Sequence, residues 1–151
     1  MTLNQLINRV RSITRDFNGS IFREQDIIDF INEGIDRVKS IPQFVPMPYP
    51  IQKTDSIKYL PSQYHSLLSV YACSRCFFQD GQSYNAGTTM NEFESKLEEL
   101  NGKIASGEVV IKDENGVPVV SDYTADFVSD VYFNSSTSDE DNLNGYIKFY
   151  Q

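Results

Sequence analysis

Apolar residues recur at helical spacing from residue 3 to residue 104 of this chain. Steps of three and four residues place apolar side chains on one face of a helix, which then turns toward a core. The first such run predicts a helix over residues 3–14, begun by the capping-box pair Thr2 and Gln5. Its apolar positions are Leu3, Leu6, Ile7, Val10 and Ile13. Asn18-Gly19 then predicts a break in the chain.

A second stripe predicts a helix with Glu24, Asp26 and Asp29 near its start and Pro42 at its end. Acidic groups at the start of a helix complement the positive end of its dipole. Proline lacks a backbone N–H and disfavours helical geometry in the residue before it. The apolar positions of this stripe are Ile27, Ile28, Ile31, Ile35, Val38 and Ile41.

Two more helices are predicted after a proline-rich interval. The third starts near Ser66 and ends at Asp80-Gly81, with a broad side made of Leu67, Leu68, Tyr71, Ala72, Arg75 and Phe78. The fourth runs from about residue 83 to residue 104, and its heptad positions are Ala86, Met90, Phe93, Leu97, Leu100 and Ile104. Because so short a heptad run does not make an independent coiled coil, we expect it to pack in a helical bundle.

The interval between the second and third helices cannot be helical throughout, because prolines occupy positions 46, 48 and 50. Residues 51–53 and 57–60 flank the turn-like sequence Thr54-Asp55-Ser56, which predicts a β-hairpin arm at about 42–61. The expected fold class is therefore mainly α. It consists of a four-helix body over residues 1–105, with this β-hairpin arm, and an extended C-terminal β-rich arm over residues 106–151.

Charge separates these two parts of the 151-residue chain, whose formal net charge is −8. Residues 1–105 hold 11 Lys and Arg against 12 Asp and Glu, whereas residues 106–151 hold 2 against 9. An acidic chain argues against sequence-independent binding of duplex DNA, which requires clustered cations. No apolar run is long enough for a membrane span, and the first residues do not resemble a secretory leader. We therefore expect a soluble, intracellular protein that does not bind a membrane.

The C-terminal arm contains three segments with strand propensity. Residues 108–112 and 117–121 surround Asn115-Gly116, which is a hairpin signal. Residues 146–150 follow the polar run 134–142, and residues 122–133 fit either a helix or a strand. An isolated hairpin is marginally stable in water, so the arm either folds back onto its own body or pairs with another chain. For the second case, the expected contact residues are Val109, Val110, Ile111, Val119, Tyr146, Ile147, Phe149 and Tyr150.

Candidate chemistry is sparse. Cys73 and Cys76 have the spacing of a redox pair or of half a zinc site. They lie inside an apolar predicted helix, and His65 is the only other Cys or His in the sequence that could complete a zinc site. The pattern therefore favours buried free thiols. A capping or surface role is expected for His65. The acidic residues at 139–141 are interpreted as a solvated linker, and Asp122, Asp126 and Asp130 as the wet side of an amphipathic segment. We expect no catalytic residue, no metal and no cofactor, and hence no enzyme.

Two sequence motifs carry a resemblance to a known family. Phe22-Arg-Glu-Gln-Asp-Ile-Ile-Asp-Phe-Ile-Asn-Glu-Gly-Ile-Asp36 opens the second helix, and Tyr59-Leu-Pro-Ser-Gln-Tyr64 precedes the third. With the order of helices around them, these motifs resemble the head–tail adaptor (connector) proteins of tailed bacteriophages. The resemblance covers residues 1–105, and its motifs are signatures of a fold and not of catalysis.

The resemblance implies an all-α body that assembles into a ring, usually of twelve copies, beneath the portal protein of a DNA-filled capsid. Such a ring extends the DNA channel, binds stopper or tail components, and lets DNA pass without specific binding. Ring contacts are expected from Phe44, Val45, Tyr49 and Ile51, and portal contacts from the C-terminal arm. The protein would be assembled in the host cytoplasm and reside in the virion neck. The alternative is a small helical regulatory module that binds another protein. The β-rich residues 106–151 depart from the simplest family pattern, which leaves their docking partner open.

Overall fold

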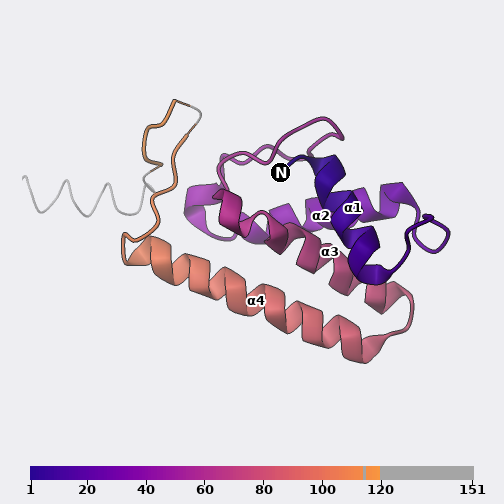
Figure 1. Ribbon diagram of the computed structural model, residues 1–151. Helices are drawn as coiled ribbons and strands as arrows, with labels where there is room; N and C mark the ends of the chain where they lie inside the picture. Colours follow the sequence, from indigo (N-terminus) through magenta and orange to yellow (C-terminus); the bar gives the residue numbers. More distant parts are fainter. Residues whose placement is uncertain (114, 120–151) are drawn as a thin grey trace, which may run out of the picture. The chain divides into compact units, whose positions relative to one another are not determined.

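The computed structural model describes residues 1–113 and 115–119 (Figure 1). This part of the chain is mainly helical, as predicted. Its elements are α1 (Leu3–Thr14), α2 (Glu24–Val38), the short 3-10 helices η1 (Pro42–Phe44) and η2 (Ser62–Tyr64), α3 (Ser66–Gln79) and α4 (Ser83–Ala105). Among these described helices, none combines the length and apolar character needed to cross a membrane.

Helix α3 lies at the centre of the bundle, where it contacts α1, α2 and α4 (Figure 1). Every residue from 67 to 74 is buried, including the small residues Ser69, Ala72 and Ser74. The prediction of one broad apolar side was therefore too narrow, because a central helix meets a neighbour on almost every side. Phe78 was wrongly placed on that side, since it lies in the last turn of α3 and is exposed.

The helix starts and ends agree closely with the sequence pattern. The capping box of α1 forms as predicted: the Gln5 backbone N–H donates to Thr2 Oγ1 at 3.3 Å, and the Thr2 N–H donates to Gln5 Oε1 at 2.9 Å. Helix α2 ends at Val38, earlier than expected. Ile41 has extended backbone (φ −84°, ψ 119°) because it precedes Pro42, although its side chain remains buried.

Helix α4 packs on α3 through the predicted heptad positions. Ala86, Phe93 and Leu100 are buried, and Met90, Leu97 and Ile104 are partly buried against the core. The Phe93 and Tyr71 rings meet edge to face with centroids 5.0 Å apart. The Ser74 hydroxyl also donates to the Ala86 carbonyl at 2.8 Å, which joins the two helices near their connecting turn.

The prediction of a β-hairpin arm at 42–61 was wrong. In the described residues this segment forms no strand; its one β-bridge joins Ser56 to Thr2 at the start of the chain. The Leu3 N–H donates to the Asp55 carbonyl at 3.1 Å, and the Ile57 N–H donates to the Met1 carbonyl at 3.0 Å. Residues 51–53 and 57–60 therefore do not pair with each other, because part of their backbone pairs with the N-terminus.

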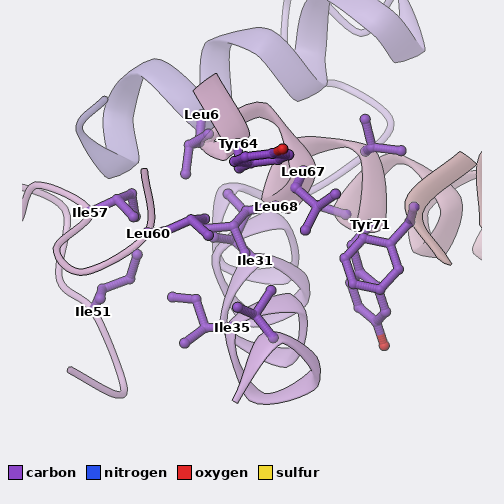
Figure 2. Close-up of a cluster of buried hydrophobic side chains, with 14 of the residues drawn as sticks. Leu6, Ile31, Ile35, Ile51, Ile57, Leu60, Tyr64, Leu67, Leu68 and Tyr71 are labelled. Carbon is purple, nitrogen blue, oxygen red and sulfur yellow. The ribbon is translucent and has the colours of Figure 1, made fainter. Parts of the chain in front are cut away.

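The physical reason is the destination of the apolar side chains in this segment. Ile51, Ile57 and Leu60 are buried, and Figure 2 shows them with Ile31 and Leu68 in one cluster. Burying a side chain of this size contributes roughly 1.5–3 kcal/mol, more than an isolated two-stranded hairpin would gain in water. The segment is therefore part of the body core.

The compact unit that contains the four helices extends to Val119, past the boundary expected near residue 105. Ile111 is buried, and Val109 and Val119 pack against the core. The two strands predicted at 108–112 and 117–121 reduce, within the described residues, to one isolated bridge between Lys112 and Pro118. Pro118 has no N–H with which to extend a ladder. The remaining residues of the predicted β-rich arm, 120–151, lie outside the described residues.

Candidate interaction surfaces

The four residues expected at ring contacts fall into two classes. Phe44 and Ile51 are buried in the core of their own chain, whereas Val45 and Tyr49 are 60% and 53% exposed. The Tyr49 ring also lies below the Lys39 ammonium, 5.7 Å from its centroid. Only Val45 and Tyr49 of this set therefore offer side-chain surface to another molecule.

The contact residues expected in the C-terminal arm divide in the same way. Val110 is exposed, Ile111 is buried, and Val109 and Val119 are partly buried against the body. Asp113 shapes the turn that follows, because its Oδ1 accepts from the backbone N–H groups of Asn115 (2.9 Å) and Val117 (2.8 Å). The other predicted contacts, Tyr146, Ile147, Phe149 and Tyr150, lie outside the described residues.

The connection between α1 and α2, residues 15–23 and hereafter the α1–α2 loop, is organised around Asp16. The Asp16 carboxylate is buried and accepts from the backbone N–H groups of Ser20 (2.8 Å), Ile21 (3.1 Å) and Phe22 (3.0 Å). It also pairs with Arg11 at 3.2 Å. Burial opposes ionisation of Asp16, but these hydrogen bonds and the nearby Arg11 charge together lower the pKa of its carboxyl group. The Asp16 side chain thus fixes residues 20–22 of the loop.

Glycine is favoured at position 19 by the backbone conformation, and a side chain there would displace the Arg11 guanidinium. Its φ is +64°, and a Cβ at this position would lie 2.6 Å from Arg11 Nη1. The predicted chain break at Asn18-Gly19 is therefore confirmed as a left-handed turn closed over the Arg11–Asp16 pair.

The α1–α2 loop presents two large apolar side chains to solvent. Phe17 is 72% exposed and Ile21 is 56% exposed. Arginines lie on both sides of them in sequence: Arg15 makes no ion pair among the described residues, and Arg23 pairs with Asp26 at 3.1 Å. A rigid loop with exposed aromatic and aliphatic groups is typical of a protein contact surface.

A groove lies beyond the other end of α2, between the turn at residues 40–42 and α4; we name it the α2–α4 groove. Its volume is about 310 Å³, and it is lined by Ser40, Ile41, Pro42, Glu94, Leu97, Glu98 and Asn101. The carboxylates of Glu94 and Glu98 make no ion pair among the described residues, whereas Glu92 and Glu99 pair with Lys96 and Lys103. The groove therefore combines apolar lining with acidic groups free to bind a cation.

An aromatic cluster surrounds Arg75 on the surface shared by α2 and α3. Its guanidinium carbon lies 5.7 Å from the Phe30 ring centroid and 6.0 Å from that of Phe78. Its Nε donates to Glu33 Oε2 at 3.1 Å. Arg75 is thus already held by two rings and a carboxylate of its own chain.

The cysteine prediction is confirmed, because Cys73 and Cys76 are free, buried thiols. Burial raises the pKa of both thiols to about 12, so neither carries thiolate character near neutral pH. Among residues 1–113 and 115–119, no cluster of three or more His, Cys, Asp and Glu side chains could hold a metal ion.

A surface or capping role for His65 was wrong. Its ring is buried and hydrogen-bonds the Leu60 carbonyl through Nε2 at 2.7 Å, while Nδ1 lies 2.6 Å from the amino group of Met1. Burial lowers the pKa of the imidazole; the hydrogen bond to the Leu60 carbonyl opposes this effect, and the nearby Met1 ammonium adds to it. The histidine therefore links the segment before α3 to the start of the chain.

Sequence reasoning missed Phe17, Ile21 and the α2–α4 groove as candidate contacts. The sequence does hold one signal for Phe17 and Ile21. They are apolar residues outside the predicted helices, in a connection that also contains Asp16 and Gly19. The groove had no sequence signal, because residues 40–42 and 94–101 meet only in the folded chain. In comparisons with protein-family models, curated proteins and solved structures, nothing matches this chain.

Proposed function

We propose that this protein is a structural head–tail adaptor: a ring component that joins a phage portal to the stopper or tail and extends the DNA channel. In this proposal it acts without catalysis or cofactor, resides in the virion neck after assembly in the host cytoplasm, and lets DNA pass without specific binding. The ring is expected to hold twelve copies.

The observation that carries the proposal is the structural role of the two family-like motifs. In the first motif, Phe22 is buried at the start of α2, and the Asn32 side chain accepts from the Ile51 N–H at 3.0 Å. In the second, Leu60 and Tyr64 are buried just before α3. Both motifs thus fasten the connection of residues 39–65 onto the body, which is what a fold signature shared by a family would do.

The distribution of exposed apolar groups also supports an assembly protein. Phe17, Ile21, Val45 and Tyr49 are all more than half exposed on connections between helices. Single exposed apolar residues are common, but several on well-packed connections suit a chain with more than one protein contact. A ring subunit that also binds a portal and a tail component needs several such contacts.

The acidic character of the chain also supports a role in lining a DNA channel. The chain carries a net charge of −8, and most of the excess lies in residues 106–151. A ring of such subunits would repel the DNA phosphates from its wall, since DNA binding depends on cations that neutralise them.

The deciding experiment measures particle mass by native mass spectrometry, with purified full-length chain and the portal protein of the same virus. We expect a ring-sized complex on the portal, which electron microscopy should show as an added ring around the channel. A chain that remains monomeric or dimeric in the presence of portal would overturn the adaptor function.

The second candidate is a small helical regulatory module that binds one other protein. The α1–α2 loop favours this candidate as well, since one rigid apolar loop suffices for a single partner. Such a module would ignore the portal and form a complex of fixed, small stoichiometry, so the same mass measurement separates the two candidates.

A further inference from the structure

We propose that copies of this chain join head to tail, with the α1–α2 loop of one copy bound in the α2–α4 groove of the next. This inference deepens the adaptor proposal, because it names the contact that would build the ring. It commits to a second copy of this chain as the occupant of the groove.

Hydrogen bonds within the subunit prepare the α1–α2 loop for binding. Asp16 holds Ser20, Ile21 and Phe22 by three backbone hydrogen bonds, so the loop is ordered before it meets a partner. Binding by a preordered segment loses less conformational entropy than binding by a flexible one. Phe17 and Ile21 can therefore act as anchors at small entropic cost.

The lining of the α2–α4 groove suits a loop with apolar and basic side chains. Ile41, Pro42 and Leu97 supply apolar surface, and the volume of about 310 Å³ accepts one or two large side chains. Glu94 and Glu98 line the same groove without an ion pair among the described residues. The groove thus offers both an apolar floor and unmatched negative charge.

The segments that carry the two surfaces have opposite net charge. Residues 1–23 contain four arginines and one aspartate, a net charge of +3, whereas α4 contains four glutamates and two lysines, a net charge of −2. Arg15 in the loop and Arg9 in α1 make no ion pair among the described residues. Two lysines are direct sequence neighbours of groove residues, and each has another partner: Lys39 lies over the Tyr49 ring, and Lys96 pairs with Glu92. Arginine beside carboxylates favours this one orientation and speeds encounter.

The two surfaces lie at opposite ends of α2 in one subunit. The loop directly precedes α2 and the groove begins just after it, so the 15 residues of α2 separate them by about 22 Å. Figure 1 shows the α1–α2 connection and the far end of α2 on opposite sides of the bundle. Different patches at opposite ends form a heterologous contact, which generates a ring if the rotation closes and a filament if it does not.

Neither the Arg75 cluster nor Tyr84 forms such a complementary pair. Arg75 already binds Glu33 and lies over Phe30 and Phe78. Tyr84 is the most exposed large apolar residue of the described part, but it does not line either described pocket. Tyr84 therefore serves as a control position.

The test uses the full chain alone, in analytical ultracentrifugation over a range of concentrations. The loop variant is Phe17→Asp, with Tyr84→Asp as its matched control. The groove variant combines Glu94→Lys with Glu98→Lys, and its matched control combines Asp29→Lys with Glu108→Lys, which makes the same change in net charge at exposed positions outside the loop and the groove. Circular dichroism checks that all four variants fold.

We expect wild type and both controls to associate with rising concentration into species larger than dimers. The loop variant and the groove variant should each raise the dissociation constant about tenfold or more, the loss of an interface anchor. A mixture of the two variants should form dimers and nothing larger. In that dimer, the intact loop of the groove variant binds the intact groove of the loop variant.

Three results would overturn the inference: a wild-type chain that stays monomeric up to about 1 mM, loop and groove variants that associate as wild type does, or a mixture that gives no dimer.

Failure of the adaptor function would give different results from failure of this contact. Head-to-tail association without portal binding would leave this contact standing and remove the adaptor. Portal rings formed equally well by all variants would keep the adaptor and remove this contact.

Discussion

Helices α3 and α4 are joined by a short turn and pack against each other, yet their surroundings differ. Nine of the 14 residues of α3 are buried, whereas only three of the 23 residues of α4 are. Helix α3 contacts three other helices, and α4 packs chiefly on α3. Helix α3 therefore contributes mainly to the stability of the fold, whereas most side chains of α4 remain available for contacts with other molecules.

This difference separates residues that hold the fold from residues that are free to bind. Side chains of α3 are constrained on nearly every side, so a change there disturbs several helices at once. Helix α4, by contrast, leaves Glu94 and Glu98 exposed in the groove proposed as a contact surface. Substitutions can test the contrast in order of expected effect.

The largest effect is expected from Leu68→Ala in α3. Leu68 is fully buried, and its truncation leaves a cavity among several helices, so we expect a loss of about 3–4 kcal/mol in the free energy of unfolding, measured in urea. The matched change in α4, Leu97→Ala, removes a partly buried side chain and should cost about 1 kcal/mol. Equal losses would contradict the contrast between the two helices.

The next largest effect is expected from Asp16→Asn in the α1–α2 loop. This loop lies near the C-terminal end of α3, where the Asp16 charge helps to raise the pKa of the Cys76 thiol. Asp16→Asn replaces a carboxylate oxygen by an NH₂ group that meets backbone N–H donors, and should cost about 2 kcal/mol at pH 7. Because the folded-state pKa of Asp16 is lowered, its contribution is present above the unfolded pKa of about 3.9 and is lost as pH falls through the folded value.

The measurement for Asp16 is a pair of urea titrations at several pH values. The stability difference between wild type and Asp16→Asn should shrink below about pH 4. A difference that stays constant from pH 7 to pH 3 would show that ionisation of Asp16 does not stabilise the loop.

A smaller effect is expected from Gly34→Ala in α2, where the chain approaches α3. A Cβ at residue 34 would lie 3.2 Å from Tyr71 Cδ1, and the Tyr71 ring is held against Phe93. Alanine gains helix propensity over glycine, but the crowding should outweigh this gain and leave a net loss of about 1 kcal/mol in urea denaturation. A more stable variant would mean that Tyr71 moves aside freely.

The smallest effect is expected from Gly102→Ala on the outer side of α4, and it should be a gain in stability. A Cβ there meets nothing within 4 Å, so only helix propensity changes. We expect a gain of about 0.5–1 kcal/mol in the same urea measurement. A loss of stability would indicate a contact at this face within the chain itself.

The helices could be predicted from the sequence because their signals are local. Thr2 and Gln5 mark the start of α1, Gly81 follows the end of α3, and the heptad positions of α4 face α3 as expected. Each signal depends on residues within a few positions of one another, so no knowledge of distant segments is needed.

The connections could not be predicted because their partners are distant in sequence. Ile57 has the local features of a strand residue, but its N–H donates to Met1 and its side chain enters the core. Similarly, Ile111 was expected to meet another molecule and instead lies in the body of its own chain. The candidate surface on the α1–α2 loop was missed because Asp16, seen alone, does not reveal that it binds three backbone N–H groups.

The sequence by itself determined four amphipathic helices, their order and most of their ends, since helix periodicity and capping are properties of neighbouring residues. The tertiary structure decided which loops joined the core and which apolar side chains remained outside. That outcome depends on which distant groups compete for the same buried space and the same backbone donors, and it becomes defined only when the helices have packed.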